Sequence, residues 1–204
     1  MKFLTSLLFT SALGLATPVI RQTQPAQIIS ASVVGEGCPQ GSFSTEISDD
    51  GQTISYGWDN YDVAVGPGAD PNGREKTCDI TLRINFPLGC TSARFSNTYH
   101  GFAQLDQGVT GTFSTQYNIS PGQLVSGGNP PPATVSASGF GGAGNVYTKS
   151  DVAVGKINAN AANQQVVTYI ARTRMFVQGS NNTVFGTLSD DDYSFSITQQ
   201  SRCW

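Results

Sequence analysis

Apolar and polar residues alternate with a period of two along much of the chain. In residues 79–86 every even-numbered residue is apolar and every odd-numbered one is polar, as a strand with one buried and one solvated face requires. The same alternation or longer apolar-rich stretches recur at 28–34, 43–47, 54–58, 94–106, 109–119, 152–154, 166–177 and 193–198. Because no stretch shows a convincing apolar period of 3.6, the pattern predicts strands throughout.

Turn-forming residues separate the predicted strands. They include Asp49-Asp50-Gly51, Gly66-Pro67-Gly68, Asp70-Pro71-Asn72-Gly73, Pro87-Leu88-Gly89, Gln107-Gly108 and Gly179-Ser180-Asn181-Asn182. About nine or ten short strands with hairpin-length connections are typical of an antiparallel β-sandwich. We therefore expect an all-β, single-domain, jelly-roll-like sandwich over residues 27–204, with Ser126–Pro132 as a long exposed loop.

The composition agrees with an all-β extracellular protein. Of 204 residues, 38% are hydrophobic and only 12% are charged, and the chain is long enough for one domain with a substantial core or two small ones. One domain is the better interpretation, because too little chain follows the loop at 126–132 for a second large sandwich. The net charge of -3 and the absence of a basic run exclude nucleic-acid binding through phosphate neutralisation.

The N-terminus has the form of a secretory signal. Lys2 precedes an apolar stretch that ends on the small residues Gly14 and Ala16, so residues 1–16 are predicted to be a signal peptide. The alternative is a membrane anchor, but the stretch is shorter than the roughly 20 residues needed to cross a bilayer. Residues 17–26 are predicted to be a flexible leader before the fold, and the mature protein is expected to be secreted.

Four cysteines are expected to form two disulfides in the oxidising secretory pathway. They are even in number and none stands in a CxxC spacing, which argues against metal binding and thiol redox chemistry. Three connectivities are possible. We favour Cys38–Cys78 with Cys90–Cys203, because the second bond would tie the C-terminus to the middle of the domain.

Two glycosylation sequons fit the same secretory route. They begin at Asn118 and Asn181. The alternation in 109–119 places Asn118 on the solvated face, where a glycan could be attached.

Recognisable catalytic motifs are absent from the sequence. Neither G-x-S-x-G nor H-E-x-x-H occurs, and the single histidine, His100, lies in an alternating segment with no serine in a strained turn to complete a triad. A zinc site would need more Cys or His ligands than these. We therefore interpret His100 as an exposed strand residue and predict no catalytic residue, no metal and no cofactor.

Carboxylates support one enzymatic alternative, a secreted glycan hydrolase. Two acids across a cleft can hydrolyse a glycoside. No spacing selects a pair among the candidates Glu36, Glu46, Asp59, Asp62, Glu75 and Asp106. The Asp-rich segments at 70–75 and 190–192 carry oxygen ligands suited to calcium, but such segments usually hydrogen-bond their own backbone in turns.

Two alternating segments, 79–86 and 94–106, would share one polar surface if they were neighbours in a sheet. Arg83 and His100 would then supply donors, and Phe102 an apolar platform. Asp79 and Asp106 would supply acceptors. That is the chemistry of a sugar-binding or protein-binding face, although a solvated sheet face requires no ligand.

Four ordered blocks resemble a known family of secreted fungal proteins. The blocks are 37–42, 59–68, 74–82 and 99–111, and the chain resembles the family catalogued as domain of unknown function 4360, closely over residues 28–120 and loosely beyond. The resemblance implies a secreted fungal protein compatible with a β-sandwich, with no established activity or site. The chain departs from the family pattern in carrying Cys90 and in lacking a cysteine near 155–165, which favours Cys90 as the partner of Cys203.

These features favour a non-enzymatic secreted interaction protein, effector-like or binding cell-wall glycans. The expected partner is a cell-wall polysaccharide or a host protein, with no nucleic acid and no membrane span. The alternatives are the carboxylate-dependent hydrolase and a structural wall component without a discrete ligand.

Overall fold

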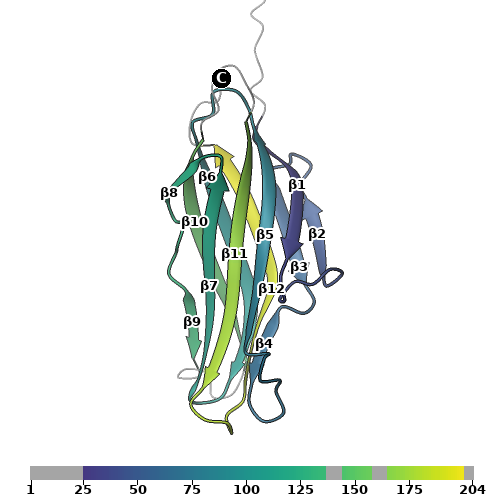
Figure 1. Ribbon diagram of the computed structural model, residues 1–204, viewed down its shortest axis with the longest axis vertical. Coiled ribbons are helices and arrows are strands. Elements are labelled where there is room, and N and C mark those ends of the chain that lie inside the picture. The colour runs from purple at the N-terminus through teal and green to yellow at the C-terminus, as the bar shows by residue number, and fades with distance from the viewer. Residues whose placement is uncertain (1–24, 137–143, 158–164, 200–204) are drawn as a thin grey trace, which may run out of the picture.

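The computed structural model describes residues 25–136, 144–157 and 165–199, and within these ranges the chain forms antiparallel strands and no helix. The strands build two sheets that pack face to face along the long axis of the molecule (Figure 1). The all-β sandwich expected from the sequence is therefore confirmed.

The first sheet contains five strands in the order β1-β5-β11-β7-β9. Their bounds are β1 Gln27–Val34, β5 Glu75–Phe86, β11 Gln165–Gly179, β7 Val109–Ser120 and β9 Ala133–Ser136. The second sheet has the order β2-β3-β12-β6-β10-β8, with β4 also paired to β12. Its strands are β2 Phe43–Ile47, β3 Thr53–Trp58, β4 Asp62–Val65, β6 Ser92–Leu105, β8 Gln123–Ser126, β10 Asn145–Lys156 and β12 Gly186–Gln199.

The predicted strands are present, but their number and lengths differ from expectation. Segments 43–47 and 54–58 become β2 and β3 at nearly the same bounds, whereas 79–86 and 94–106 belong to strands of 12 and 14 residues. The expectation of short strands was wrong for these. The twelve described strands also include β4, β8 and β9, which have four residues each and are too short to show a clear alternation. The loop between β8 and β9 lies where the Pro-rich stretch predicted it.

The core between the sheets is rich in aromatic side chains. Tyr99 stacks on Tyr193 with ring centroids 4.7 Å apart, and Phe95 lies 4.9 Å from Tyr169, which joins the two sheets. Burying a tyrosine requires a partner for its hydroxyl. For Tyr61 and Tyr169 the core supplies these partners from within, because the Tyr61 hydroxyl contacts Thr173 Oγ1 at 2.7 Å and the Tyr169 hydroxyl donates to Asn97 Oδ1 at 3.0 Å.

A disulfide joins Cys38 to Cys78, as predicted. Cys90 is also disulfide-bonded, and Cys203, its expected partner, lies outside the described residues, so that pairing stays a prediction. The predicted signal peptide and most of the leader also lie outside the described residues. Ala26, the last residue of the predicted leader, is buried in the core, so the packed part of the chain begins before Gln27.

Candidate functional site

The binding face predicted from the sequence does not form. Asp79 and Arg83 lie on β5 in the first sheet, whereas His100 and Phe102 lie on β6 in the second. Both strands turn their apolar residues into the shared core, so their polar faces point away from each other on opposite sides of the sandwich. The assumption that β5 and β6 are neighbours in one sheet was therefore wrong.

The short connection between β5 and β6 explains the error. Residues 87–91 carry the chain from one sheet to the other, with Gly89 at a φ of 76° that favours glycine. Alternation specifies which face of a strand is buried, and it says nothing about which strand lies alongside. A hairpin and a crossover between sheets therefore look alike in the sequence.

The members of the predicted face on the second sheet have separate surroundings. His100 Nδ1 lies 2.7 Å from Asp192 Oδ1 on β12, and Phe102 is exposed opposite Val146 on β10. Asp106, just after β6, accepts a hydrogen bond from the Phe185 backbone N–H at 2.8 Å. His100 is thus an exposed strand histidine, and Asp106 fixes a loop.

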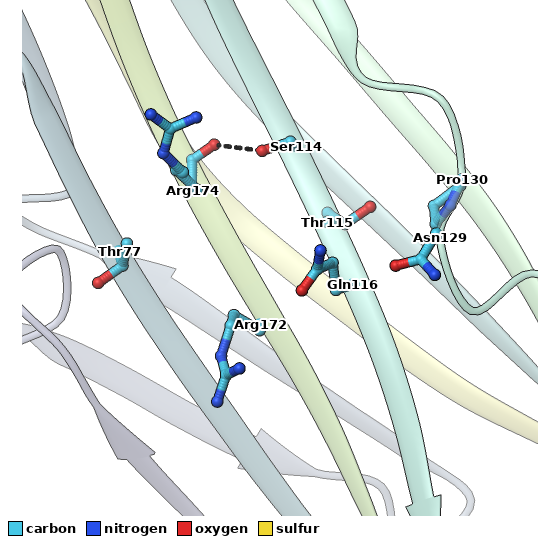
Figure 2. A pocket seen from close by; sticks show the side chains of 8 residues that line it. All are labelled: Thr77, Ser114, Thr115, Gln116, Asn129, Pro130, Arg172 and Arg174. Carbon is cyan, nitrogen blue, oxygen red and sulfur yellow. Dashed lines mark hydrogen bonds between the residues drawn. The ribbon is translucent and has the colours of Figure 1, made fainter.

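A hollow of about 300 Å³, lined mostly by residues with polar side chains, lies instead on the outer face of the first sheet (Figure 2). Strands β5, β7 and β11 form its floor, and the loop after β8 forms one wall. We call it the arginine groove and define it by the residues that line it: Thr77, Ser114, Thr115, Gln116, Asn129, Pro130, Arg172 and Arg174.

Two ion pairs hold the arginines of the groove in place. Arg172 Nε and Nη2 donate to the carboxylate of Asp79 at 2.9–3.0 Å. Arg174 Nε and Nη2 donate to Glu75 at 2.5 and 2.7 Å, and its guanidinium carbon lies 5.4 Å from the ring centroid of Phe176. A bidentate pair fixes the plane of a guanidinium. The groove therefore presents oriented donors on a rigid sheet.

The ion pairs also shift the pKa values of Glu75 and Arg172. The hydrogen bond from Arg174 lowers the pKa of the Glu75 carboxyl below its usual value, and the bond to Asp79 raises the pKa of Arg172. Each arginine is balanced by its own carboxylate. The groove consequently carries little net charge across the neutral pH range.

The groups that line the groove suit hydrogen bonding to hydroxyl-rich ligands. Within the described part of the chain, Nη1 of Arg172 and Nη1 of Arg174 make no hydrogen bond and remain available. The amides of Gln116 and Asn129 offer both donors and acceptors, as sugar hydroxyls require. Thr115 differs, because its hydroxyl turns inward and donates to Asp151.

Acid–base hydrolysis has less support in this groove. No carboxylate is among its described lining residues, and a general acid needs a raised pKa, whereas that of nearby Glu75 is lowered. Another candidate acid, Asp62, lies on β4 in the second sheet, and its Oδ1 is 3.5 Å from Lys76 Nζ. The described residues contain no group of three or more His, Cys, Asp or Glu side chains placed to hold a metal ion.

The sequence contained a signal for this groove that the prediction did not use. Residues 166–177 were interpreted as an apolar-rich strand, although Arg172, Arg174 and Gln178 alternate with buried Thr173, Met175 and Val177. That alternation places both arginines on the solvated face. The contributions of Asn129 and Pro130 came from a loop, which no periodicity could position.

The predicted glycosylation sites are both exposed. Asn118 lies on β7 two residues beyond Gln116, on the same outer face as the arginine groove, and its Oδ1 accepts the Ile119 N–H. Asn181 lies in the turn between β11 and β12, where its Oδ1 accepts two hydrogen bonds from Thr183. Glycosylation of either residue stays a prediction. A glycan on Asn118 would lie beside the groove.

Asp190 was expected to lie in an acidic turn, but it lies within β12 and points into the core. Its side chain is 2% exposed, and neither carboxylate oxygen has a hydrogen-bond partner among the described residues. Desolvation, reinforced by the negative charges of Asp192 and Asp191, raises the pKa of Asp190 well above its usual value. The nearby Trp58 indole only partly offsets this rise.

Comparison with known proteins identifies relatives of the chain. The family described as "Domain of unknown function (DUF4360)" matches residues 24–203. An uncharacterized secreted protein of Arthroderma benhamiae is 34% identical over 93 residues. The chain covers only 38% of that relative, and the match spans 46% of the chain. The secreted location predicted from the sequence agrees with this relative.

Among the described residues there is no helix of the length and hydrophobicity needed to cross a membrane.

Several solved β-proteins show a distant similarity. One is TmCBM61, solved with β-1,4-galactotriose, at a TM-score of 0.24 and 10% identity, covering 85% of this chain and 91% of that one. Another is the N-terminal cellulose-binding domain of Cellulomonas fimi β-1,4-glucanase C, at a TM-score of 0.29 and 11% identity. That match covers 82% of this chain and 95% of the domain. Winged bean acidic lectin complexed with methyl-α-D-galactose has a TM-score of 0.34 and 7% identity, and the match covers 83% of this chain and 100% of the lectin. At these TM-scores the similarity carries no conclusion about a ligand.

Proposed function

The chain belongs to the family of the domain of unknown function DUF4360, and we propose that it is a secreted, non-enzymatic protein that binds a neutral cell-wall polysaccharide in the arginine groove. The proposal rests on one observation. Residues with guanidinium, amide and hydroxyl groups line a single hollow, and the charges of both arginines are already balanced by carboxylates.

This charge balance favours a neutral ligand over an acidic one. An unpaired arginine would attract a uronate or a phosphate. Here Asp79 and Glu75 already supply the acidic partner of each arginine, which leaves the remaining N–H groups to donate to neutral sugar hydroxyls. Binding of this kind should depend only weakly on salt, because exposed charges that are already paired gain little from a neutral ligand.

The first test is a pull-down of the purified protein on a panel of insoluble fungal and plant polysaccharides, with soluble sugars assayed in parallel. The expected result is retention on a neutral polysaccharide without new reducing ends. Replacing Gln116 and Asn129 together with Ala is expected to weaken retention at least about tenfold, since each lost hydrogen bond to a ligand is worth about 1 kcal/mol. Arg94→Ala, on the exposed face of the second sheet, is the control and should bind normally.

Different outcomes would overturn the proposal. New reducing ends would indicate a hydrolase, and retention only on acidic polysaccharides would contradict the neutral ligand. Undiminished retention of the Gln116→Ala, Asn129→Ala variant would show that another surface binds. Failure to bind any polysaccharide would leave a host protein or a structural role.

A second comparison separates the groove from the face predicted by sequence. Arg83→Ala combined with Phe102→Ala removes one residue from each outer face, and both lie outside the groove. We expect this double variant to bind the same polysaccharide with an unchanged dissociation constant, measured by isothermal titration with a soluble oligosaccharide. A clear loss of affinity would show that Arg83 or Phe102 contributes to the binding site.

A further inference from the structure

A row of three reactive side chains lies inside the sandwich, beneath the arginine groove. Lys149 and Asp151 point inward from β10, and Asn97 points inward from the neighbouring strand β6. Their exposed fractions are 5%, 7% and 1%, respectively. An amine, a carboxylate and a carboxamide are thus held together out of contact with water.

Asp151 binds the lysine directly. Lys149 Nζ lies 2.5 Å from Asp151 Oδ1 and 2.6 Å from Oδ2. The Thr115 and Tyr117 hydroxyls donate to Oδ2 at 2.8 and 2.7 Å, which fixes the carboxylate from the opposite sheet. A base in contact with an amine can remove the proton that keeps it from acting as a nucleophile.

The hydrogen bonds to the Asn97 carboxamide are of the kind that activate a carbonyl as an electrophile. Its Oδ1 accepts hydrogen bonds from the Tyr193 hydroxyl at 2.8 Å and the Tyr169 hydroxyl at 3.0 Å. Two donors on one carbonyl oxygen stabilise the negative charge that develops there when a nucleophile attacks the carbon. The Nδ2 group, by contrast, is buried and has no hydrogen-bond partner among the described residues.

The register of the strands brings the amine toward this amide. Asp151 stands directly opposite Asn97, and Lys149, two residues earlier on the same face, stands diagonally across from it. A long side chain can span such a diagonal between antiparallel strands. The carboxylate that contacts Nζ therefore lies in the same cross-strand row as the amide.

We propose that Lys149 and Asn97 join in an isopeptide bond that crosslinks β10 to β6, with Asp151 as the proton carrier. One proton of the Lys149 ammonium passes to Asp151, and the Nζ lone pair attacks Cγ of Asn97. The Cγ–Nδ2 bond then breaks. Nδ2 leaves with its own two protons, a third proton from Nζ and a fourth from Asp151. It therefore departs as ammonium, and Asp151 is again a carboxylate.

The product satisfies the core better than the starting groups do. The new carbonyl oxygen keeps its two phenol donors, and the new N–H can donate to Asp151, which retains Thr115 and Tyr117. The buried ammonium and the unpartnered Nδ2 are both removed. A buried charge and an unsatisfied buried donor each destabilise a fold, so the structure favours the joined state.

The test is a tryptic digest of the denatured, reduced protein, read by mass spectrometry. The chain contains no Lys or Arg between Arg94 and Lys149, so an unmodified protein yields fragments 95–149 and 150–156. Trypsin does not cleave after an acylated lysine. We expect fragment 150–156 to be missing, and residues 95–156 to remain one fragment that is lighter than its sequence mass by one ammonia after removal of any N-glycan.

Variants make the result specific. Lys149→Arg should restore release of 150–156, and Asp151→Asn should restore it by leaving Lys149 unreacted. Lys156→Arg, an exposed lysine on the same strand, is the control and should leave the crosslink intact. Free 150–156 from the wild-type protein in full yield would overturn the proposal, and so would a loss of water, which would place the bond on Asp151 instead. This readout is independent of any glycan binding.

Discussion

Replacing Asp190 with asparagine should raise the melting temperature at pH 7 and remove the loss of stability that sets in as pH rises above about 4. The carboxyl is buried, without a hydrogen-bond partner among the described residues, and its neighbours include the acidic Asp192 and Asp191. The phenols of Tyr61 and Tyr147 also lie near it. Ionising Asp190 in the fold is therefore unfavourable.

The direction of this change in stability follows from the raised pKa of the Asp190 carboxyl. In the unfolded chain the carboxyl ionises near its ordinary pKa of about 3.9, whereas in the fold it holds its proton to a higher pH. Between those two values the folded state binds more protons, so the free energy of unfolding falls by about 1.4 kcal/mol per pH unit as pH rises. The loss ends at the pKa of the folded carboxyl. Asparagine has no proton to lose and avoids this loss.

Thermal unfolding followed by circular dichroism from pH 3 to pH 8 would measure the difference. The wild-type protein and the variant should have similar stability near pH 3 and diverge above pH 4. Asp59→Asn, which changes an exposed carboxylate, is the matched control and should follow the wild-type curve. Parallel curves for wild type and Asp190→Asn would show that Asp190 ionises in the fold at little cost.

Removing the Cys38–Cys78 disulfide should lower the free energy of unfolding by about 4 kcal/mol and the melting temperature by about 10 °C. The bond joins residues 40 positions apart, and both sulfurs are buried. Closing a loop of that length restricts the unfolded chain, which is the source of the expected stabilisation. The bond also holds the segment before β2 against β5.

The measurement uses a double Cys38→Ala, Cys78→Ala variant, so that no free thiol remains at this position. Near-ultraviolet circular dichroism should show that the aromatic core is retained, because the close ring pairs Phe95–Tyr169 and Tyr99–Tyr193 lie on β6, β11 and β12 and not on β5, which carries Cys78. A fall of less than about 3 °C would indicate that packing alone holds this segment in place.

The alternation of residues determined much of the fold in advance. In 94–106, Asn97 shares its parity with Phe95 and Tyr99, and all three are buried as that parity predicts. The same reasoning placed Asn118 outward and would have placed Arg172 and Arg174 outward as well. Side-chain direction alternates strictly along a regular strand, so a local pattern suffices to assign it.

Asp190 shows where local alternation fails. Tyr193, Phe195 and Ile197 are buried, so strict alternation would turn Asp191 inward and Asp190 outward. A register shift between Asp190 and Asp192 in the pairing with β6 reverses the parity, and Asp190 enters the core. A β-bulge inserts one residue into one strand of a pair, and the pairing partner is not visible in the strand's own sequence.

The sequence by itself determined where the longer strands lie and which of their faces is buried, apart from the bulge in β12. Tertiary structure alone decided which strands became neighbours. It separated Arg83 from His100, brought Arg172 beside Gln116 and placed Lys149 diagonally from Asn97. Strand pairing depends on contacts between distant segments, whereas alternation depends only on adjacent residues. The arginine groove and the Lys149–Asn97 pair both depend on strand order, which local pattern leaves open.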